Sequence, residues 1–421
     1  MHKDILSEYY HADNPKTFLN ESYRDEDHWV SPYNFIHQVT DNYCIPDKVK
    51  IHDCTLRDGE QTPGVVFTRD DKIAIAKKLS DIGVDRIEAG MPVVAKDDYE
   101  AIKEINKLGL PAKTVAFCRG NVKDVEVAAE CGVKAVVIEV PVGETRYKWQ
   151  FAKWTTEDMY AKTLEPIKLA KKLGMEVIFF PYETTRGNPD FTQEFLYTVY
   201  KEAPFDSTAV IDTLGVATPG AIRYMVKMFK DLLPVPVEVH THNDFGMGVA
   251  NTLAAVEAGA NCVHTSVNGL GERTGNAPID EVVAAMKYLY NIPVNIDCSQ
   301  LVELSDLVAS LSNRKVDDHK PITGSATYTR EIGAGIGLMS SAPLAIFPFR
   351  PEVFGNHSGV MIGKKSGSDS IRVKMKEYGM PEASDDDVKL ILNDVKEYSI
   401  AHKRCLTDDE LKAIIAQKLT K

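Results

Sequence analysis

Two histidines separated by one residue, His240 and His242, are the side chains of this 421-residue chain best suited to metal chemistry. They follow the apolar run 235–239, which predicts a short buried strand. Alternate side chains of a strand point to one face, so both imidazoles are expected to face the same way. Two neutral imidazoles and a carboxylate from elsewhere form a metal site with open coordination positions. Without that carboxylate, the pattern describes only two polar residues at a strand end.

Four further polar segments also follow predicted strands. The segments are 53–61, 87–92, 212–217 and 268–276, and they include Arg57, Asp58, Gln61, Glu88, Thr213 and Asn276. A charged Glu88 at the end of a buried strand is costly unless it is paired, for example with Arg57. A turn with a surface ion pair would explain Asp58 on its own. Five polar segments at strand ends indicate one shared site.

The elements that must position these segments alternate between strand and helix. Strands are predicted at 49–54, 85–89, 114–118, 135–140, 176–180, 209–212, 235–240 and 261–267. Helices are predicted at 69–82, 96–107, 122–131, 156–173, 191–201, 219–233 and 249–258. This alternation predicts an α/β fold, a (β/α)8 TIM barrel, with the chemistry at the C-terminal ends of the strands. A doubly wound open sheet is the alternative, but no Gly-x-Gly-x-x-Gly follows the first strand.

Three regions are expected along the chain. Residues 1–46 carry many aromatic rings, which predicts an N-terminal arm that packs on the main body or on a second subunit. Residues 47–298 are predicted to form the catalytic barrel, and residues 299–421 a smaller, mostly helical C-terminal linker and second domain. The arm and the second domain are expected to exchange contacts in a homodimer.

Composition and charge exclude several classes of protein. The hydrophobic fraction of 44% and the charged fraction of 26% are typical of a globular chain. The net charge of −12 argues against a nucleic-acid partner. No apolar run is long enough to cross a membrane, and the N-terminus lacks the apolar core of a signal peptide, so a cytoplasmic location is expected. The seven scattered cysteines are expected to be free thiols.

Three blocks of residues resemble one enzyme family: 55–61, 240–244 with Asn251, and 268–276. The chain is similar to the metal-dependent barrels that include 2-isopropylmalate synthase, homocitrate synthase and hydroxymethylglutaryl-CoA lyase. The resemblance implies a divalent metal (Mn²⁺, Zn²⁺ or Mg²⁺) bound by Asp58, His240, His242 and Asn276. It also implies that Arg57 lies against an enolate oxygen, that Gln61 and Glu88 support the site, and that Thr213 contacts the substrate carboxylate.

The loop after the eighth strand favours the synthases within this family. They carry Gly-x-Gly-Glu-Arg there, and the chain has Glu272 and Arg273 in those positions. The region after residue 298 also resembles the smaller second domain of the synthases. The chain ends soon after Gly367, as expected of a short form such as homocitrate synthase or Re-citrate synthase.

Two departures from the family pattern bear on the reaction and its substrate. Gly335 stands where the synthases carry a histidine used in acid/base chemistry, which leaves His319, Tyr328 or His357 as replacements. The segment 182–186 has one residue fewer between Glu and Arg than the usual Glu-Asp-x-x-Arg.

The resemblance implies an acyltransferase that condenses acetyl-CoA with a 2-oxo acid. Arg146, Arg186 and Arg330 lie in polar segments expected near the substrate, and a buried cation requires an anion. This favours a dicarboxylic oxo acid, such as oxaloacetate or 2-oxoglutarate, and a citrate- or homocitrate-like product, unless each Arg pairs with a neighbouring Glu. The alternatives are a 2-isopropylmalate or citramalate synthase, a carbon–carbon lyase of the same family, and a ligand-binding protein without activity.

Overall fold

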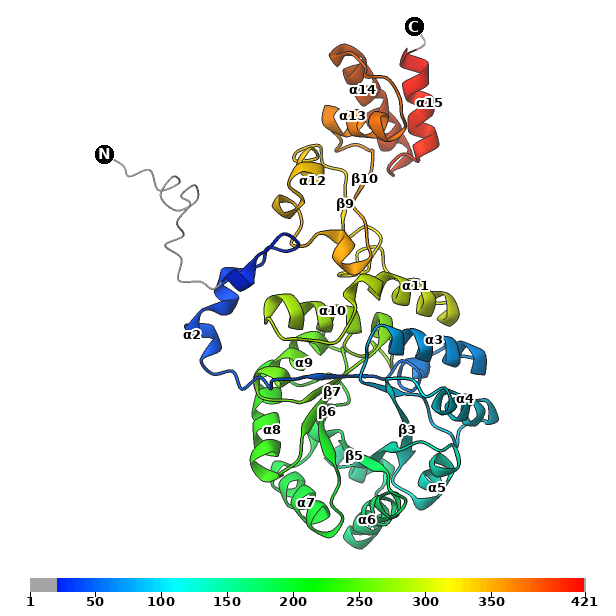
Figure 1. Ribbon diagram of the computed structural model, residues 1–421, viewed down its shortest axis with the longest axis vertical. Helices are drawn as coiled ribbons and strands as arrows, with labels where there is room; N and C mark the ends of the chain where they lie inside the picture. Colours follow the sequence, from blue (N-terminus) through cyan, green and yellow to red (C-terminus); the bar gives the residue numbers. More distant parts are fainter. Residues whose placement is uncertain (1–20, 420–421) are drawn as a thin grey trace, which may run out of the picture. The chain divides into compact units, whose positions relative to one another are not determined.

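Eight parallel strands close into a barrel in the order β1 to β8 (Figure 1). The structure is a computed structural model that describes residues 21–419. The strands are β1 (Lys50–Asp53), β2 (Arg86–Glu88), β3 (Lys113–Arg119), β4 (Ala135–Pro141), β5 (Glu176–Tyr182), β6 (Ser207–Asp212), β7 (Val237–Thr241) and β8 (Cys262–Thr265). Because β1 pairs with both β2 and β8, the sheet is closed, and the predicted TIM barrel is confirmed over the open sheet.

Helices follow the strands and cover the outside of the barrel. They are α3 (Arg69–Asp81), α4 (Lys96–Lys107), α5 (Val122–Glu130), α6 (Thr156–Lys172), α7 (Pro189–Glu202), α8 (Pro219–Leu232), α9 (Gly248–Glu257) and α10 (Ile279–Ala284). Side-chain caps fix the N-terminal ends of two helices. At α3 the Thr68 hydroxyl accepts a hydrogen bond from the backbone N–H of Asp71, and Thr155 caps α6 in the same way. Pro236 lacks the N–H that a ladder needs, and β7 begins directly after it.

The interior of the barrel has two chemically different halves. Strands β3 to β6 point apolar side chains inward, among them Val115, Val137, Ile178 and Ile211. Strands β1, β2, β7 and β8 instead bury His52, Arg86, Glu88, Glu238, His240 and His264. These charges are paired, for example by the 2.7 Å bond from Arg86 to Glu238, which offsets the cost of burying them. The polar half leads directly to the strand ends where the predicted site lies.

The described chain divides into two compact units. Unit 1 contains the barrel and comprises the described residues before Glu26, Val30–Asp297 and Leu304–Arg314, and unit 2 comprises the remaining described residues. The helix α11 (Leu301–Ser312) is divided between them. In unit 1 the segment before the barrel is tied to α9, because the Cys44 N–H donates to the Glu257 carbonyl. Tyr9, Tyr10 and Phe18 of the predicted arm lie outside the described residues.

Unit 2 is largely helical, as predicted for the C-terminal region. It contains a two-stranded parallel sheet, β9 (Thr329–Arg330) with β10 (Gly359–Val360), and the helices α12 (Leu338–Ser341), α13 (Ser368–Glu377), α14 (Asp385–His402) and α15 (Asp408–Leu419). Its small core includes Val388, Ile391 and Val395 of α14 with Leu411 and Ile415 of α15. These positions recur at three- and four-residue spacing, as the buried face of a helix requires.

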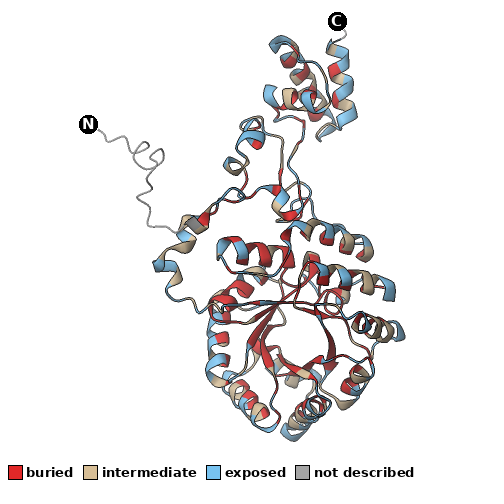
Figure 2. Cartoon of the chain, viewed as in Figure 1, coloured by how far each residue is buried: buried red, intermediate tan, exposed pale blue. Residues whose placement is uncertain are grey.

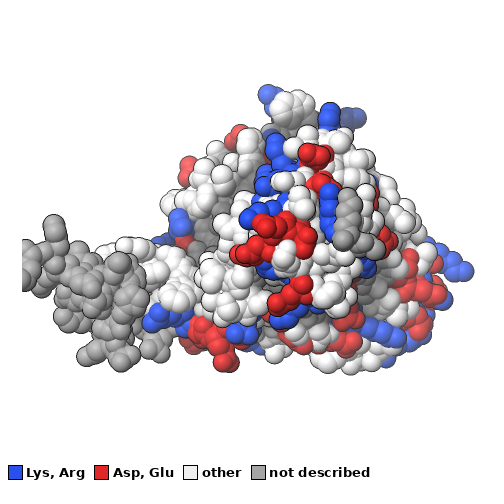
Figure 3. Space-filling view, turned by 90° about the horizontal axis from the view of Figure 1, so that it is seen from above, with Lys and Arg blue, Asp and Glu red and all other residues white. Residues whose placement is uncertain are grey.

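The strands of the barrel and the surrounding helices differ in how far they are buried. The strands are buried, whereas the helices of the coat show exposed outer faces (Figure 2). On the face seen in Figure 3, acidic and basic side chains lie side by side. All seven cysteines are free thiols, as predicted, and five of them are buried. In the described part of the chain, no helix combines the length and apolar character needed to span a membrane.

Candidate metal centre and its surroundings

A cluster of Asp58, His240 and His242 lies at the C-terminal end of β7, as the sequence predicts. The Asp58 Oδ2 atom is 3.1 Å from Nε2 of His240 and 3.6 Å from Nε2 of His242. The two Nε2 atoms are 3.4 Å apart. The alternation of β7 turns both imidazoles inward, and the loop after β1 brings the carboxylate to them. Three ligand atoms therefore converge on one point.

The amide of Asn276 completes this cluster. Its Nδ2 atom is 3.2 Å from Oδ2 of Asp58 and 3.2 Å from Nε2 of His240. Asn276 reaches this place because the loop after β8 is pinned to the end of β7, where the Asn243 N–H donates to the Gly275 carbonyl at 2.9 Å. Gly275 has a φ of +82°, and a Cβ there would lie 1.7 Å from the Gly269 carbonyl oxygen. Only glycine fits this turn.

The protonation of the cluster suits a metal cation. Burial acts to raise the pKa of Asp58, but the Arg57 guanidinium and the hydrogen bond from His240 outweigh it, so the pKa lies well below its usual range. Burial lowers the pKa of His240, and it lowers the pKa of His242 to about 4. At neutral pH the cluster therefore offers an ionised carboxylate and two neutral imidazoles, the protonation states that metal ligands need.

The donor set fits a divalent metal ion. Among residues 21–419, Oδ1 of Asp58 and Oδ1 of Asn276 are buried without a hydrogen-bond partner. An unsatisfied buried oxygen is costly, and coordination to a cation removes that cost. Two imidazoles with carboxylate and amide oxygens suit Mn²⁺ or Zn²⁺ and, less well, Mg²⁺. Asp58, His240, His242 and Asn276 are thus brought together as the resemblance implies.

Arg57 and Glu88 form a buried ion pair beside the cluster, and the predicted pairing is confirmed. Nε of Arg57 donates to Oε1 of Glu88, and Nη1 of Arg57 is 3.4 Å from Oδ2 of Asp58. The guanidinium also lies over the ring of Phe117, 4.3 Å from its centroid. Burial acts to raise the pKa of Glu88, but Arg57 and His52 lower it to about 2. Glu88 is therefore an anion that fixes the direction of the guanidinium.

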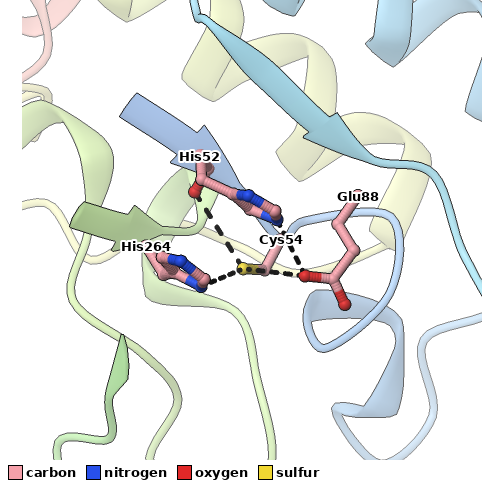
Figure 4. A group of neighbouring side chains, drawn as sticks. All are labelled: His52, Cys54, Glu88 and His264. Carbon is pink, nitrogen blue, oxygen red and sulfur yellow. Dashed lines mark hydrogen bonds and ion pairs between the residues drawn. The ribbon is translucent and has the colours of Figure 1, made fainter. Parts of the chain in front are cut away.

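A second buried group, His52, Cys54 and His264, lies to one side of Glu88 (Figure 4). His52 Nε2 is 2.9 Å from Oε2 of Glu88, and Sγ of Cys54 is 3.7 Å from the same oxygen. Cys54 Sγ also lies 4.0 Å from Nδ1 of His264, whose Nε2 is 2.8 Å from Oε2 of Glu238. The residue types would suit a transition metal, so the ring geometry decides the matter.

The stacking of His52 on His264 excludes one ion shared by both rings. The ring centroids are 4.2 Å apart and the planes differ by 5°. A metal bound to an imidazole nitrogen lies close to the plane of that ring, because the lone pair lies in the plane. Two parallel planes do not meet within the cluster, so no ion can satisfy both histidines. The group instead supports Glu88 through hydrogen bonds.

Arg146 and Arg186 converge on one buried carboxylate, that of Glu183. Nε of Arg146 is 3.3 Å from Oε2 of Glu183, and Arg186 bonds Oε1. Thr145 donates to Oε2 at 2.7 Å. Glu183 has a left-handed φ of +62°, and its neighbour Gly143 leaves room for the carboxylate, since a Cβ there would lie 2.1 Å from Oε2. Two partly exposed cations therefore share one anion, which leaves a positive charge at the ends of β4 and β5.

The other predicted site residues occupy less central positions. Gln61 is exposed in the turn after β1. The Thr213 hydroxyl accepts from the backbone N–H of Glu183 at 2.8 Å, so it helps to hold the strained residue. His319, Tyr328 and Arg330 belong to unit 2. His319 is exposed, Tyr328 is buried with its pKa raised by burial to about 12, and Arg330 bonds the Ala334 carbonyl at 3.2 Å.

Several polar residues of the barrel interior are absent from the sequence-based prediction. His52, Glu139, Glu238 and His264 lie within runs that the sequence presents simply as buried strands. Each of these four residues lies at an inward-facing position of its strand. A polar or charged residue at such a position is the signal from which the sequence could have predicted it.

Comparisons with known proteins agree with this fold. Residues 48–308 match the model of the HMGL-like family. A 2-isopropylmalate synthase of Methanocaldococcus jannaschii is 38% identical over 93% of this chain and 75% of its own length. A homocitrate synthase of Methanothermobacter thermautotrophicus is 33% identical over 88% of this chain and 93% of its own. An (R)-citramalate synthase of M. jannaschii is 37% identical over 88% of this chain and 74% of its own length. Among solved structures, the HMG-CoA lyase of Bacillus subtilis shares the fold, with a TM-score of 0.59 and 21% identity over 65% of this chain and 96% of the lyase.

Proposed function

This chain belongs to the HMGL-like family, and from that membership we propose that it is an enzyme that condenses acetyl-CoA with a 2-oxo acid. Its relatives are named as synthases of 2-isopropylmalate, homocitrate and citramalate. Each of these products is a 2-hydroxy acid with a carboxymethyl group on the carbinol carbon. Addition of an acetyl unit to the ketone of a 2-oxo acid gives that arrangement, and the acyl group becomes an alkyl group on transfer.

The observation that carries the proposal is the convergence of Asp58, His240, His242 and Asn276 at the barrel mouth. We propose that these residues hold the divalent metal, with Mn²⁺ as the first choice. When bound there, the ion would draw electrons from the ketone of the 2-oxo acid and so favour attack on its carbon. The buried, neutral imidazoles and the ionised carboxylate keep the site ready for a cation at neutral pH.

Arg57 supplies the second electrostatic element of the proposed site. Removal of a methyl proton from acetyl-CoA places negative charge on the thioester oxygen, and a fixed cation stabilises that charge as it develops. Glu88 and Phe117 hold the guanidinium in one orientation, so it needs little reorganisation during the reaction. Gln61 is proposed to support this site from the adjoining turn.

The substrate we propose is a dicarboxylic 2-oxo acid. Arg146 and Arg186 are partly exposed and share the single carboxylate of Glu183, and we propose that the positive charge left over attracts a substrate anion. Thr213, which holds the backbone of Glu183, is proposed to contact a substrate carboxylate, and Arg330 of unit 2 is proposed as a further contact. A monocarboxylic branched acid would leave this charge without a partner.

Two assays test the proposal. The first measures thiol release from acetyl-CoA with oxaloacetate, 2-oxoglutarate, 2-oxoisovalerate or pyruvate, in the presence of Mn²⁺. Thiol release that depends on both substrates supports the synthase, whereas cleavage of a 3-hydroxy acid without thiol release identifies a lyase. The second compares kcat/KM among the four acids. A clear preference for 2-oxoisovalerate would reject the dicarboxylic substrate and favour 2-isopropylmalate formation.

The finer proposals concern the surroundings of the reaction. His319 and Tyr328 of unit 2 are proposed acid/base groups for the later hydrolysis of the thioester, and the variants H319A and Y328F test them. We propose a homodimer in the cytoplasm that binds no nucleic acid, with residues 47–298 as the catalytic domain. Sedimentation of the intact chain as a monomer would reject the dimer.

A further inference from the structure

Glu139 is an acidic residue on the inner face of β4. Successive residues of a strand alternate between faces, and Glu139 has the parity of Ala135 and Val137, which belong to the buried interior of the barrel. It lies two positions nearer the C-terminal end than Val137. The carboxyl group is therefore directed into the barrel at the end where Arg57 and the proposed metal ligands lie.

The strand register places Glu139 beside residues that contact the proposed site. Across the β4–β5 ladder, Glu139 is paired with Phe180, whose ring is 5.9 Å from that of His240. On the other side, Glu139 is paired with Arg119, whose guanidinium is bonded to Asp124. Phe117, the ring beneath the Arg57 guanidinium, is paired with Val137, two residues before Glu139. Glu139 thus lies on β4 at the level of Phe180 and two residues nearer the C-terminal end than the level of Phe117. The charges that act on it are those of Arg57, Asp58, Glu88 and Arg146.

No part of the described chain satisfies this carboxyl group. The Glu139 carboxyl group forms neither a hydrogen bond nor an ion pair with any residue between 21 and 419. Its side chain is half-buried, so part of it is accessible. Every other acid named in this interior, including Glu88 and Glu238, has a close partner. A carboxyl group without a protein partner, directed at a reaction centre, is available to the substrate.

We propose that Glu139 is a catalytic residue that carries the proton during the condensation, an inference that rests on the proposed function. Its carboxylate takes a proton from the methyl carbon of acetyl-CoA, and the C–H electron pair forms the enolate beside Arg57. The enolate carbon then bonds to the ketone carbon of the 2-oxo acid, and the ketone π electrons move to its oxygen. That oxygen takes the proton back from Glu139, so the residue ends the addition unchanged, and water later cleaves the thioester.

The proton affinity of Glu139 agrees with this role. Burial raises the pKa of Glu139 to about 7, against a smaller opposing effect of Arg57. A group that must both accept and return a proton near neutral pH works best with a pKa close to that pH.

The test compares the wild type with Glu139→Gln, which keeps the size of the side chain and removes its proton chemistry. Thiol release is measured with Mn²⁺, acetyl-CoA and whichever of the four oxo acids the wild type uses best. We expect kcat to fall by about 10²- to 10⁴-fold, with KM for the oxo acid and the Kd for Mn²⁺ unchanged. The isotope effect with methyl-deuterated acetyl-CoA should rise, because proton removal becomes slower, and Glu139→Asp should recover part of kcat.

Controls separate the possible outcomes. Glu144→Gln removes an exposed carboxylate just after the same strand and should leave kcat unchanged. Circular dichroism and thermal melting verify that each variant is folded. If Glu139→Gln retains kcat, or loses activity only through KM or Mn²⁺ binding, Glu139 is not the proton carrier, although the wild type still shows the synthase reaction. If the wild type releases no thiol with any of the four acids, the proposed function itself is rejected.

Discussion

Arg57 donates its Nε–H to the carboxylate of Glu88 inside the barrel mouth, where both side chains are almost fully buried. The bond to Glu88 comes from one edge of the guanidinium, while its face lies on Phe117. A planar cation held at its edge and on its face has one orientation left. The remaining N–H groups can therefore point to a fixed place beside the metal cluster.

The first prediction concerns this orientation. Arg57→Lys keeps the charge but removes the planar group that Glu88 and Phe117 hold, so kcat should fall by about 10²-fold or more. Mn²⁺ binding should persist, because Arg57 is not a ligand. Thiol-release kinetics and a Mn²⁺ titration measure the two properties. Near-normal turnover in the variant would show that Arg57 serves only to neutralise Glu88.

The second prediction concerns the metal ligands. His240→Ala and His242→Ala each remove one of the converging nitrogen atoms, so Mn²⁺ affinity should weaken by about 10²-fold or more and thiol release should be lost. Elemental analysis and Mn²⁺ titration of the purified variants measure the effect. His37→Ala, which removes an exposed imidazole of the same unit, is the matched control. Full metal content in the double variant would reject the assignment.

The third prediction concerns Asp53, a fully buried carboxyl group on β1. Burial raises the pKa of Asp53 to about 7, against the hydrogen bond from the Thr55 N–H. From its usual pKa up to about 7 the folded state holds a proton that the unfolded state has lost. The contribution of Asp53 to stability is therefore present at low pH and is lost as the pH rises to 7.

Asp53→Asn removes the ionisable group, so this loss of stability at higher pH no longer occurs. The amide oxygen can still accept the hydrogen bond from the Thr55 N–H. We expect the variant's free energy of unfolding to exceed that of the wild type by about 1–3 kcal/mol at pH 8, with a smaller gain at pH 4.5. Urea unfolding at several pH values measures the difference. Asp47→Asn, an exposed counterpart, should show no such trend. A gain that does not depend on pH would reject the explanation.

The fourth prediction concerns Gly143. A methyl group there would lie 2.1 Å from Oε2 of Glu183 and would displace the carboxylate that holds Arg146 and Arg186. Gly143→Ala should lower the free energy of unfolding by about 1–3 kcal/mol and raise KM for the oxo acid more than it lowers kcat. Gly220→Ala, where the new atom has no close neighbour, is the control. An unchanged KM for the oxo acid would show that Arg146 and Arg186 do not bind the substrate.

Elements with local signals were predictable from the sequence. The hydroxyl caps at Thr68 and Thr155 act within a few residues of the helix starts that they set. The start of β7 was predicted two residues too early, at 235, because Pro236 was included in the strand. The inward direction of His240 and His242 was equally local, because a strand alternates its faces. Asp58 and Asn276 required the family resemblance, since only the closed barrel brings these loops to β7.

The missing part of the site depends on register between strands. His52 lies beside His264 because β1 and β8 pair at those two residues, although more than two hundred positions separate them in the chain. The level of Glu139 is set in the same way by its pairing with Phe180. No pattern within a single strand encodes which residue of the next strand stands beside it. The sequence shows charged residues at inward-facing positions, but it does not show which residues of other strands they contact.

The unequal halves of the barrel interior also bear on how this enzyme can diversify. Exchanging one aliphatic side chain for another of similar volume costs less than about 1.5 kcal/mol, so the inward aliphatic positions on β3 to β6, unlike Glu139 and Phe117, can vary singly. Removing one member of a buried ion pair costs about 3–5 kcal/mol, so Arg86 or Glu238 can change only together with its partner. A randomised library selected for activity on new oxo acids should therefore accumulate accepted interior substitutions on β3 to β6. The inward charged residues of β1, β2, β7 and β8 should stay unchanged.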